Sequence, residues 1–236
     1  MDILLIGGLW LDGSAWNDVV PELAALGHRA VVITNTAATL DEQLAEVVAA
    51  VDAADDAALV VGHSAACTLA WLAADARPTQ VAKLALIGGF PSSDGKLFAD
   101  FFEIKDGVMP FPGWEPFEED NSAADLDAPA RRAFEATAAP VPEAVAHGVV
   151  RLSDERRYEV PVAVVCPEFS VAQAQDWIAE GLVPQLSKAK HVEFVDIDSG
   201  HWPMLTKPAE LARILAALAN ADAVTDVDPD TDARTQ

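Results

Sequence analysis

The sequence predicts an α/β protein built on one parallel sheet with helices on both faces. Six short apolar segments of strand length alternate with segments whose apolar residues recur at helical spacing, as in successive βαβ units. The chain is 236 residues long, which fits one large domain and is enough to bury a sizeable core. The expected strands occupy residues 3–6, 30–33, 57–61, 81–87, 160–165 and 191–197.

Two of the covering helices have clear boundaries in the sequence. The helix between the second and third strands starts with a capping box, because Thr39 is followed three residues later by Glu42. The last helix covers about residues 208–218, with Pro208 close to its start. Each has an apolar stripe to bury, made of Leu40, Leu44, Val47, Val48 and Val51 in the first and of Leu211, Ile214, Leu215 and Leu218 in the second.

About seventy residues separate the fourth and fifth strands, far more than a connecting helix needs. We call residues 91–157 the insert, and residues 1–90 with 158–220 the core. The insert follows the carboxyl end of a strand, the edge where open α/β sheets bind ligands, and has helix-compatible stretches near 128–137 and 142–149. We expect a helical lid over an apolar pocket; alternatively, its large apolar side chains only pack against the sheet. They are Phe98, Phe101, Phe102, Met109, Phe111, Trp114 and Phe117.

The net charge of −23 argues against nucleic acid, anionic membranes and strongly anionic substrates, because the mean field repels all three. Small neutral substrates fit better. The acidity indicates either adaptation to salt or an ordinary surface of solvated carboxylates. Residues 221–236, rich in Asp and poor in apolar mass, are expected to form a disordered acidic tail.

No leader or membrane-spanning segment is visible in the sequence, so we expect a cytoplasmic protein, either a monomer or a homodimer. The two cysteines, Cys67 and Cys166, are too few for a disulfide framework and are expected to be buried free thiols.

The stretch Gly62-His63-Ser64-Ala65-Ala66 has the pattern of a nucleophile elbow, because it joins an expected strand to an expected helix. A serine on so sharp a turn adopts a strained backbone, and small residues two positions before and after it avoid collisions. The first turn of the helix offers free N–H groups to an oxyanion. Ser64 is therefore the candidate nucleophile.

A serine nucleophile needs a base, and His201 has the right context. It lies in the loop Asp198-Ser199-Gly200-His201-Trp202-Pro203, after the last strand and before the last helix, at the same sheet edge as Ser64. His147, in the insert, is the alternative base. The other three histidines fit structural roles: His28 follows Gly27 as a surface residue at a helix end, His63 is the variable residue of the elbow, and His191 begins a strand.

Together with Gly200-His201, the elbow resembles the α/β-hydrolase superfamily, and so does the run from Leu5 to Trp16. The chain is most similar to the small cofactor-independent group of plant methyl esterases and hydroxynitrile lyases, over residues 3 to about 218. The resemblance implies an oxyanion hole formed by the backbone amides of Leu9 and Ala65. It also implies a substrate pocket beside Trp10, His63 and Trp202.

The chain departs from that family at two places. Gly7-Gly8 stands where His-Gly is usual, and the extra flexibility is expected to loosen the oxyanion turn. The family's acid is an Asp after the penultimate strand, where this chain has Glu168. Asp198, three residues before the base, is the rival acid, and Asp176 reads as a solvated helix residue.

The implied activity is hydrolysis of carboxylic esters of small, neutral, fairly apolar substrates through an acyl-enzyme. It needs no cofactor; the histidines are too scattered for a metal site, and Gly7-Gly8 lacks the Lys-Ser/Thr of a phosphate loop. Two alternatives remain open. One is a hydroxynitrile-lyase-like enzyme, for which Lys96 and Lys105 are the only lysines to consider, and the other is a binder of small ligands without turnover.

Overall fold

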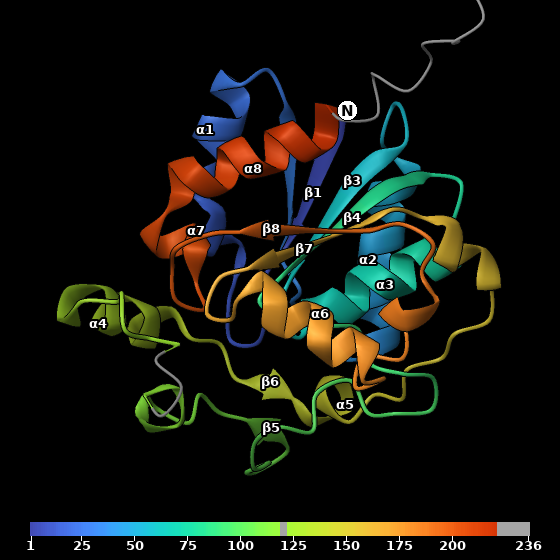
Figure 1. Cartoon of the computed structure of the whole chain (residues 1–236). Helices are drawn as coiled ribbons and strands as arrows, with labels where there is room; N and C mark the ends of the chain where they lie inside the picture. Colours follow the sequence, from blue (N-terminus) through green and yellow to red (C-terminus); the bar gives the residue numbers. More distant parts are fainter. Residues whose placement is uncertain (119–121, 221–236) are drawn as a thin grey trace, which may run out of the picture.

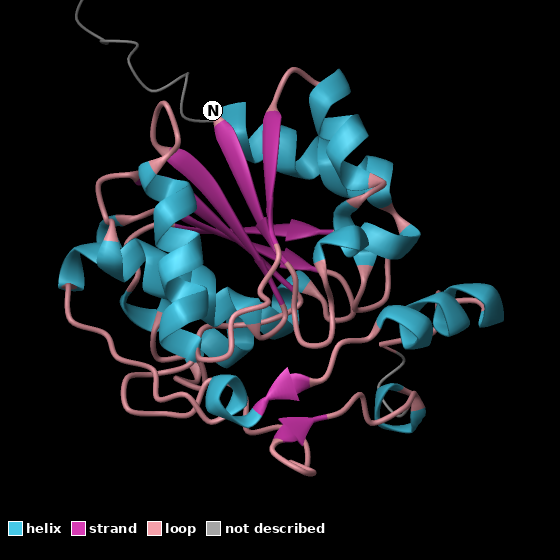
Figure 2. Ribbon diagram, turned by 180° about the vertical axis from the view of Figure 1, so that it is seen from behind, coloured by secondary structure: helices cyan, strands magenta, loops and turns pink. Residues whose placement is uncertain are grey.

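The computed structural model describes residues 1–118 and 122–220. It confirms the predicted fold class, since one six-stranded parallel sheet forms the centre of the molecule with helices around it (Figures 1 and 2). The strand order is β2-β1-β3-β4-β7-β8, and every neighbouring pair is parallel. The strands are β1 (Asp2–Ile6), β2 (Arg29–Ile33), β3 (Ala58–His63), β4 (Val81–Ile87), β7 (Val162–Cys166) and β8 (Val192–Asp196). The expected acidic tail lies outside the described residues.

The strand order reverses between β1 and β3, and this reversal positions the site. The chain moves from β1 outward to β2 and then returns to place β3 on the other side of β1. Ile6 pairs with Gly62, so the turns that follow β1 and β3 leave the sheet side by side. Open α/β sheets bind ligands at such a switch point, outside the carboxyl ends of the strands.

Helices cover the sheet on both faces. The pair α1 and α8 packs together on one face, and α2 packs with α3 on the other. The predicted capping box at the start of α2 is confirmed: Thr39 Oγ1 accepts from the Glu42 amide at 3.2 Å, and the Glu42 carboxylate accepts from the Thr39 amide at 3.1 Å. The α-helices of the core are α1 (Val19–Ala25), α2 (Leu40–Asp52), α3 (Ala66–Ala76), α6 (Val171–Ala179), α7 (Pro203–Thr206) and α8 (Pro208–Asn220), and its 3-10 helices are Gly13–Trp16 and Leu186–Lys188.

One expectation about the surface is wrong. His28 is buried, with 8% of its surface exposed, rather than a surface residue. Its N–H donates to the carbonyl of Leu23, and Gly27, at φ +87°, donates to Ala24. These two bonds form a Schellman motif, in which the residue after the glycine folds back onto the helix and becomes covered.

The insert lies across the carboxyl ends of the strands (Figure 1). Its antiparallel pair β5–β6 was not predicted, because two residues per strand give no alternating pattern. Edge-to-face contacts at 5.2–5.6 Å join Trp114, Phe117 and Phe134 of the insert to Trp202 of the core. Its elements are β5 (Val108–Met109), α4 (Ala128–Thr137), β6 (Val141–Pro142), α5 (Glu143–Ala146) and two 3-10 helices, Glu115–Phe117 and Glu155–Glu159, the second of which continues into the core.

A buried ion pair fastens the end of the insert to the core. The carboxylate of Asp75 in α3 accepts from Nη1 of Arg157 at 3.0 Å and from the amides of Ser153 and Asp154. The Asp75 and Arg157 side chains are each 7% exposed. Removing one partner would leave the other charge buried and unpaired.

Across the described residues, no helix is both long enough and apolar enough to cross a bilayer.

Candidate active site

Ser64 sits on the predicted strand-to-helix turn, between the end of β3 and the start of α3. Its φ is +55°, a left-handed conformation that costs a residue other than glycine about 1–3 kcal/mol. The backbone is crowded on both sides. A Cβ at Gly62 would lie 2.4 Å from the carbonyl oxygen of Ala66, and one at Gly89 would lie 2.7 Å from that of Ser64. The two glycines let the turn close tightly enough to lift Ser64 above the sheet edge.

The turn after β1 touches the elbow directly. A Cβ at Gly8 would lie 2.9 Å from both Ser64 Cβ and His63 Nδ1, so only glycine fits there. The expected loosening therefore does not apply to Gly8, which is confined by its neighbours. Within the described chain, neither the Leu9 nor the Ala65 amide donates a hydrogen bond. Both N–H groups are available to a ligand oxygen.

His201 contacts Glu168 across two neighbouring loops. Glu168 follows the end of β7, His201 follows the adjacent β8, and Nδ1 of the imidazole lies 2.5 Å from Oε1 of the carboxylate. Both side chains are 15% exposed. Gly88, at φ +59°, makes room for the pair, because a Cβ there would lie 3.2 Å from Nδ1 and 3.3 Å from Glu168 Oε2. The contact orients the imidazole so that Nε2 is left for a substrate or nucleophile.

The other candidates for acid and base lie elsewhere. Asp198 is exposed and forms no hydrogen bond with His201, and Asp176 is an exposed residue of α6. His147 lies in the insert, 3.6 Å from the carboxylates of Asp100 and Glu143. His191 is exposed before β8. Of the carboxylates proposed from the sequence, Glu168 is the one that contacts the imidazole.

His63 binds the backbone of the candidate base, His201. It is 1% exposed, and its Nε2 lies 2.7 Å from the backbone carbonyl of His201, so Nε2 carries the hydrogen and donates it. Burial and the neighbouring charge of His201 hold the pKa of His63 well below its usual range. His63 is therefore a neutral hydrogen-bond donor that fixes the loop bearing His201.

The insert also holds this loop. Ser122 accepts from the His201 amide through its carbonyl oxygen at 2.7 Å, and Asp125 Oδ2 accepts from the Gly200 amide at 2.8 Å. A Cβ at Gly200 would lie 2.3 Å from both Ser122 O and Asp125 Oδ1. Sequence reasoning missed Ser122 and Asp125 because they lie 75 or more positions from the residues that they bind; the glycine before His201 was the only local sign.

Ser64 and His201 line one small cavity, of about 50 Å³, and no hydrogen bond joins their side chains. This volume accommodates a few water molecules, whereas pockets for organic ligands measure about 300–1,000 Å³. The cavity brings together the three residues predicted for the substrate pocket and adds three phenylalanines of the insert. Its other lining residues are Leu9, Trp10, His63, Phe101, Phe102, Phe117 and Trp202.

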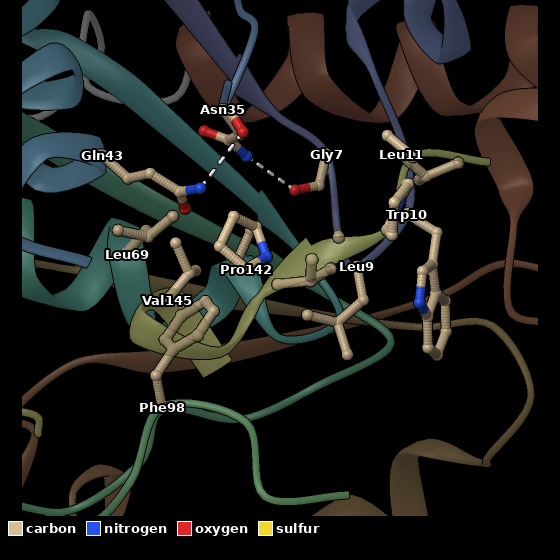
Figure 3. A pocket seen from close by; sticks show the side chains of 15 residues that line it. Gly7, Leu9, Trp10, Leu11, Asn35, Gln43, Leu69, Phe98, Pro142 and Val145 are labelled. Carbon is tan, nitrogen blue, oxygen red and sulfur yellow. Dashed lines mark hydrogen bonds between the residues drawn. The ribbon is translucent and has the colours of Figure 1, made fainter. Parts of the chain in front are cut away.

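A second cavity of about 50 Å³ lies behind the turn after β1 and shares Leu9 and Trp10 with the first (Figure 3). Its walls are mostly apolar, from Leu69 of α3 and from Phe98 and Val145 of the insert. Two amide side chains, Asn35 and Gln43, form its polar end.

Side chains that bind metals are scattered through the fold. Among the described residues, no three His, Cys, Asp or Glu side chains are grouped closely enough to hold a metal ion. The two cysteines are free and buried.

Residues 3–214 match the profile of the alpha/beta hydrolase family. The chain belongs to this family. Solved structures agree on the fold. An extracellular alpha/beta-hydrolase from a Paenibacillus species, described as sharing structural and functional homology with tobacco Salicylic Acid Binding Protein 2, is 20% identical, with a TM-score of 0.74 over 93% of this chain and 98% of that one.

Two further solved structures have similar TM-scores. A pyrethroid hydrolase from Sphingobium faniae is 20% identical, with a TM-score of 0.69 over 94% of this chain and 98% of its own. A methylesterase from Arabidopsis is 12% identical, with a TM-score of 0.70 over 93% of this chain and 99% of its own. A comparison with curated proteins finds no match.

Proposed function

We propose that this member of the alpha/beta hydrolase family is a serine esterase for small, neutral, fairly apolar carboxylic esters. The observation that carries the proposal is the 2.5 Å contact between His201 Nδ1 and Glu168 Oε1, at the cavity that Ser64 also lines. A nucleophile, a base and an acid that orients the base are the three parts of the Ser-His-acid triad. The plant methylesterase and the pyrethroid hydrolase among the similar structures support an ester substrate.

The reaction follows from these parts. The Ser64 hydroxyl attacks the ester carbonyl carbon and forms a new C–O bond, while Nε2 of His201 takes its proton. The Leu9 and Ala65 amides donate to the negative oxygen that develops. His201 returns the proton to the departing alcohol as the ester C–O bond breaks, leaving an acyl-enzyme. Water, activated by the same histidine, then releases the carboxylic acid and restores Ser64.

The size of the cavity implies that the insert or its side chains move before a substrate enters. Phe101, which lines the cavity and is 61% exposed, stands between the cavity and solvent. Movement of this segment would admit an ester, and its return would exclude bulk water during the reaction. We assign the insert the role of a lid on this basis.

We further propose that the enzyme works in the cytoplasm as a monomer or homodimer, without metal or cofactor, and that neither nucleic acid nor membrane is a partner. The net charge of −23 supports the exclusion of polyanionic partners.

Labelling with a fluorophosphonate and hydrolysis of short p-nitrophenyl esters test the proposal. We expect the label on Ser64, and we expect Ser64→Ala to abolish both labelling and hydrolysis. Ser187→Ala is the matched control, because Ser187 is an exposed serine whose hydroxyl donates to Ile178 in the core. Saturable ester binding without turnover would instead favour the ligand-binding alternative. Cleavage of a cyanohydrin in preference to esters would favour the lyase, although in the described chain no lysine lines the cavity of Ser64.

A further inference from the structure

The second cavity contains a chain of hydrogen bonds that ends on the turn after β1. Asn35 Nδ2 donates to the carbonyl oxygen of Gly7 at 2.9 Å. Gln43 Nε2 in turn donates to the backbone carbonyls of Asn35 at 3.1 Å and Ala37 at 3.2 Å. Figure 3 shows Asn35 between Gln43 and Gly7, with one dashed bond to each. The chain therefore connects helix α2 to the turn that bears the Leu9 amide.

Asn35 has the backbone as well as the side chain for this position. It follows β2, whose Ile33 pairs with Ile6 of β1, so the loop after β2 passes beside Gly7. Its φ is +50°, a conformation that asparagine tolerates better than most residues. Because the Gly7 carbonyl can only accept, the amide nitrogen of Asn35 must face it. The Oδ1 atom is buried without a hydrogen-bond partner in the described chain.

Gln43 is an unusual residue for its place in α2. It is 5% exposed and lies on the face that also buries Leu40, Val47 and Val51. An apolar residue would satisfy the packing of such a stripe, whereas a buried amide must find hydrogen-bond partners. Here the partners are the carbonyls of the Asn35 loop. The capping box holds the start of α2, so Gln43 acts from a fixed position.

The turn that receives this bond has two further backbone hydrogen bonds, from the Leu11 amide to the Gly8 carbonyl at 3.3 Å and from the Ala139 amide to the Trp10 carbonyl at 3.0 Å, but neither involves Gly7. Gly7 and Gly8 have no side chains, and glycine costs about 0.5–1 kcal/mol more than alanine to order. Contact with the elbow confines Gly8. Gly7 is instead held by the Asn35 amide. An oxyanion donor is effective only when its N–H is aimed in advance, and a displacement of about 1 Å costs roughly 10²-fold in rate.

We propose that Asn35 and Gln43 are positioning residues that aim the Leu9 amide at the oxyanion by fixing the carbonyl of Gly7. This inference rests on the proposed esterase function for its kinetic consequence. The restraint of the turn by Asn35 and Gln43 can also be measured without any enzymatic activity.

The test uses substitutions that remove the donor while keeping the backbone or the packing. Asn35→Gly keeps the left-handed backbone, Asn35→Asp keeps the shape, and Gln43→Leu keeps the volume. Gln185→Leu is the matched control: Gln185 is a buried amide, 6% exposed, that accepts from Tyr158 far from the turn. For p-nitrophenyl esters we expect kcat to fall about ten- to hundredfold in the first three variants with KM little changed, because the oxyanion forms only in the transition state. The control is expected to keep kcat even if its melting temperature falls.

Hydrogen–deuterium exchange of the peptide over residues 7–11 gives the second readout. We expect faster exchange in Asn35→Gly and Gln43→Leu than in the unmodified protein, and no increase in Gln185→Leu. Unchanged exchange at this peptide would overturn the proposal, as would full kcat in Asn35→Gly. If the unmodified protein neither hydrolyses esters nor is labelled at Ser64, the proposed function fails, and exchange alone still decides the role of Asn35 and Gln43.

Discussion

Glu168 lies two residues beyond the end of β7 and brings its Oε1 to 2.5 Å from Nδ1 of His201, at the place where the family resemblance implies a shorter aspartate. The longer side chain spans the gap between the two loops. Asp198, nearer to His201 in sequence, is exposed and does not bond to it.

Substitutions of Glu168 and Asp198 should therefore have different effects on catalysis. We expect Glu168→Gln to lower kcat/KM for p-nitrophenyl esters by roughly 10²- to 10⁴-fold, because the amide neither stabilises the imidazolium nor selects the working tautomer. Asp198→Asn should stay close to the unmodified enzyme. A large loss in Asp198→Asn with an active Glu168→Gln would reverse the assignment.

Gly8→Ala tests the close approach of the turn after β1 to the elbow. The added methyl group would lie 2.9 Å from both Ser64 Cβ and His63 Nδ1, so the turn and the elbow must move apart. We expect kcat/KM to fall at least about tenfold. In Gly181→Ala, the methyl group enters open space at φ +77°, so the melting temperature should fall while kcat is kept. Equal activity of the two variants would contradict a tight turn.

The low pKa of His63 predicts a pH-dependent stability. In the unfolded chain His63 binds a proton near pH 6.5, whereas in the folded protein burial and His201 prevent this. The contribution of neutral His63 to the free energy of unfolding is complete above about pH 6.5. It is lost as the pH falls toward the pKa of His63 in the folded protein, because protonation then favours the unfolded state. In urea unfolding at several pH values, we expect His63→Gln to lose less free energy of unfolding on acidification than the unmodified protein. Parallel curves would show that His63 is not the group responsible.

The buried pair of Asp75 and Arg157 predicts a large loss of stability. We expect Asp75→Asn to lower the free energy of unfolding by about 3–5 kcal/mol, because Arg157 is left buried without a counter-charge. The exposed pair of Lys190 and Glu159 is the control, and Lys190→Gln should change the unfolding midpoint little. Denaturant unfolding measures both. If the two substitutions lowered the free energy of unfolding by similar amounts, burial of the Asp75–Arg157 pair would not account for its contribution to stability.

Much of the fold could be predicted because its signals are local. The six strands are short and mostly apolar, and Thr39 with Glu42 marks the start of a helix within four residues. The elbow was visible for the same reason, since Gly62 and Ser64 are neighbours on one turn. The placement of His201 at the same edge followed from the parallel order of the strands.

The rest could not be predicted because it depends on contacts between distant segments. The spacing of Gln43 in α2 fits the buried stripe, but a polar amide gives no apolar signal, and only its bonds to the Asn35 loop account for its burial. Asp125 has no local pattern that would connect it with Gly200. His28 was expected at the surface because a glycine before it ends the helix, although the Schellman turn folds it inward.

Ser122 and Asp125 accept hydrogen bonds from the backbone of His201 and Gly200. These two bonds limit how this protein can change in evolution or by engineering. A chimaera in which a different insert replaced residues 91–157 would lose the two acceptors that bind the loop of His201, whatever pocket the new insert formed. The new insert must therefore place a carbonyl beside the His201 amide and a carboxylate beside the Gly200 amide. Changes of substrate range by recombination are therefore restricted to segments that keep these acceptors, and the remaining freedom lies in the phenylalanines around Phe101.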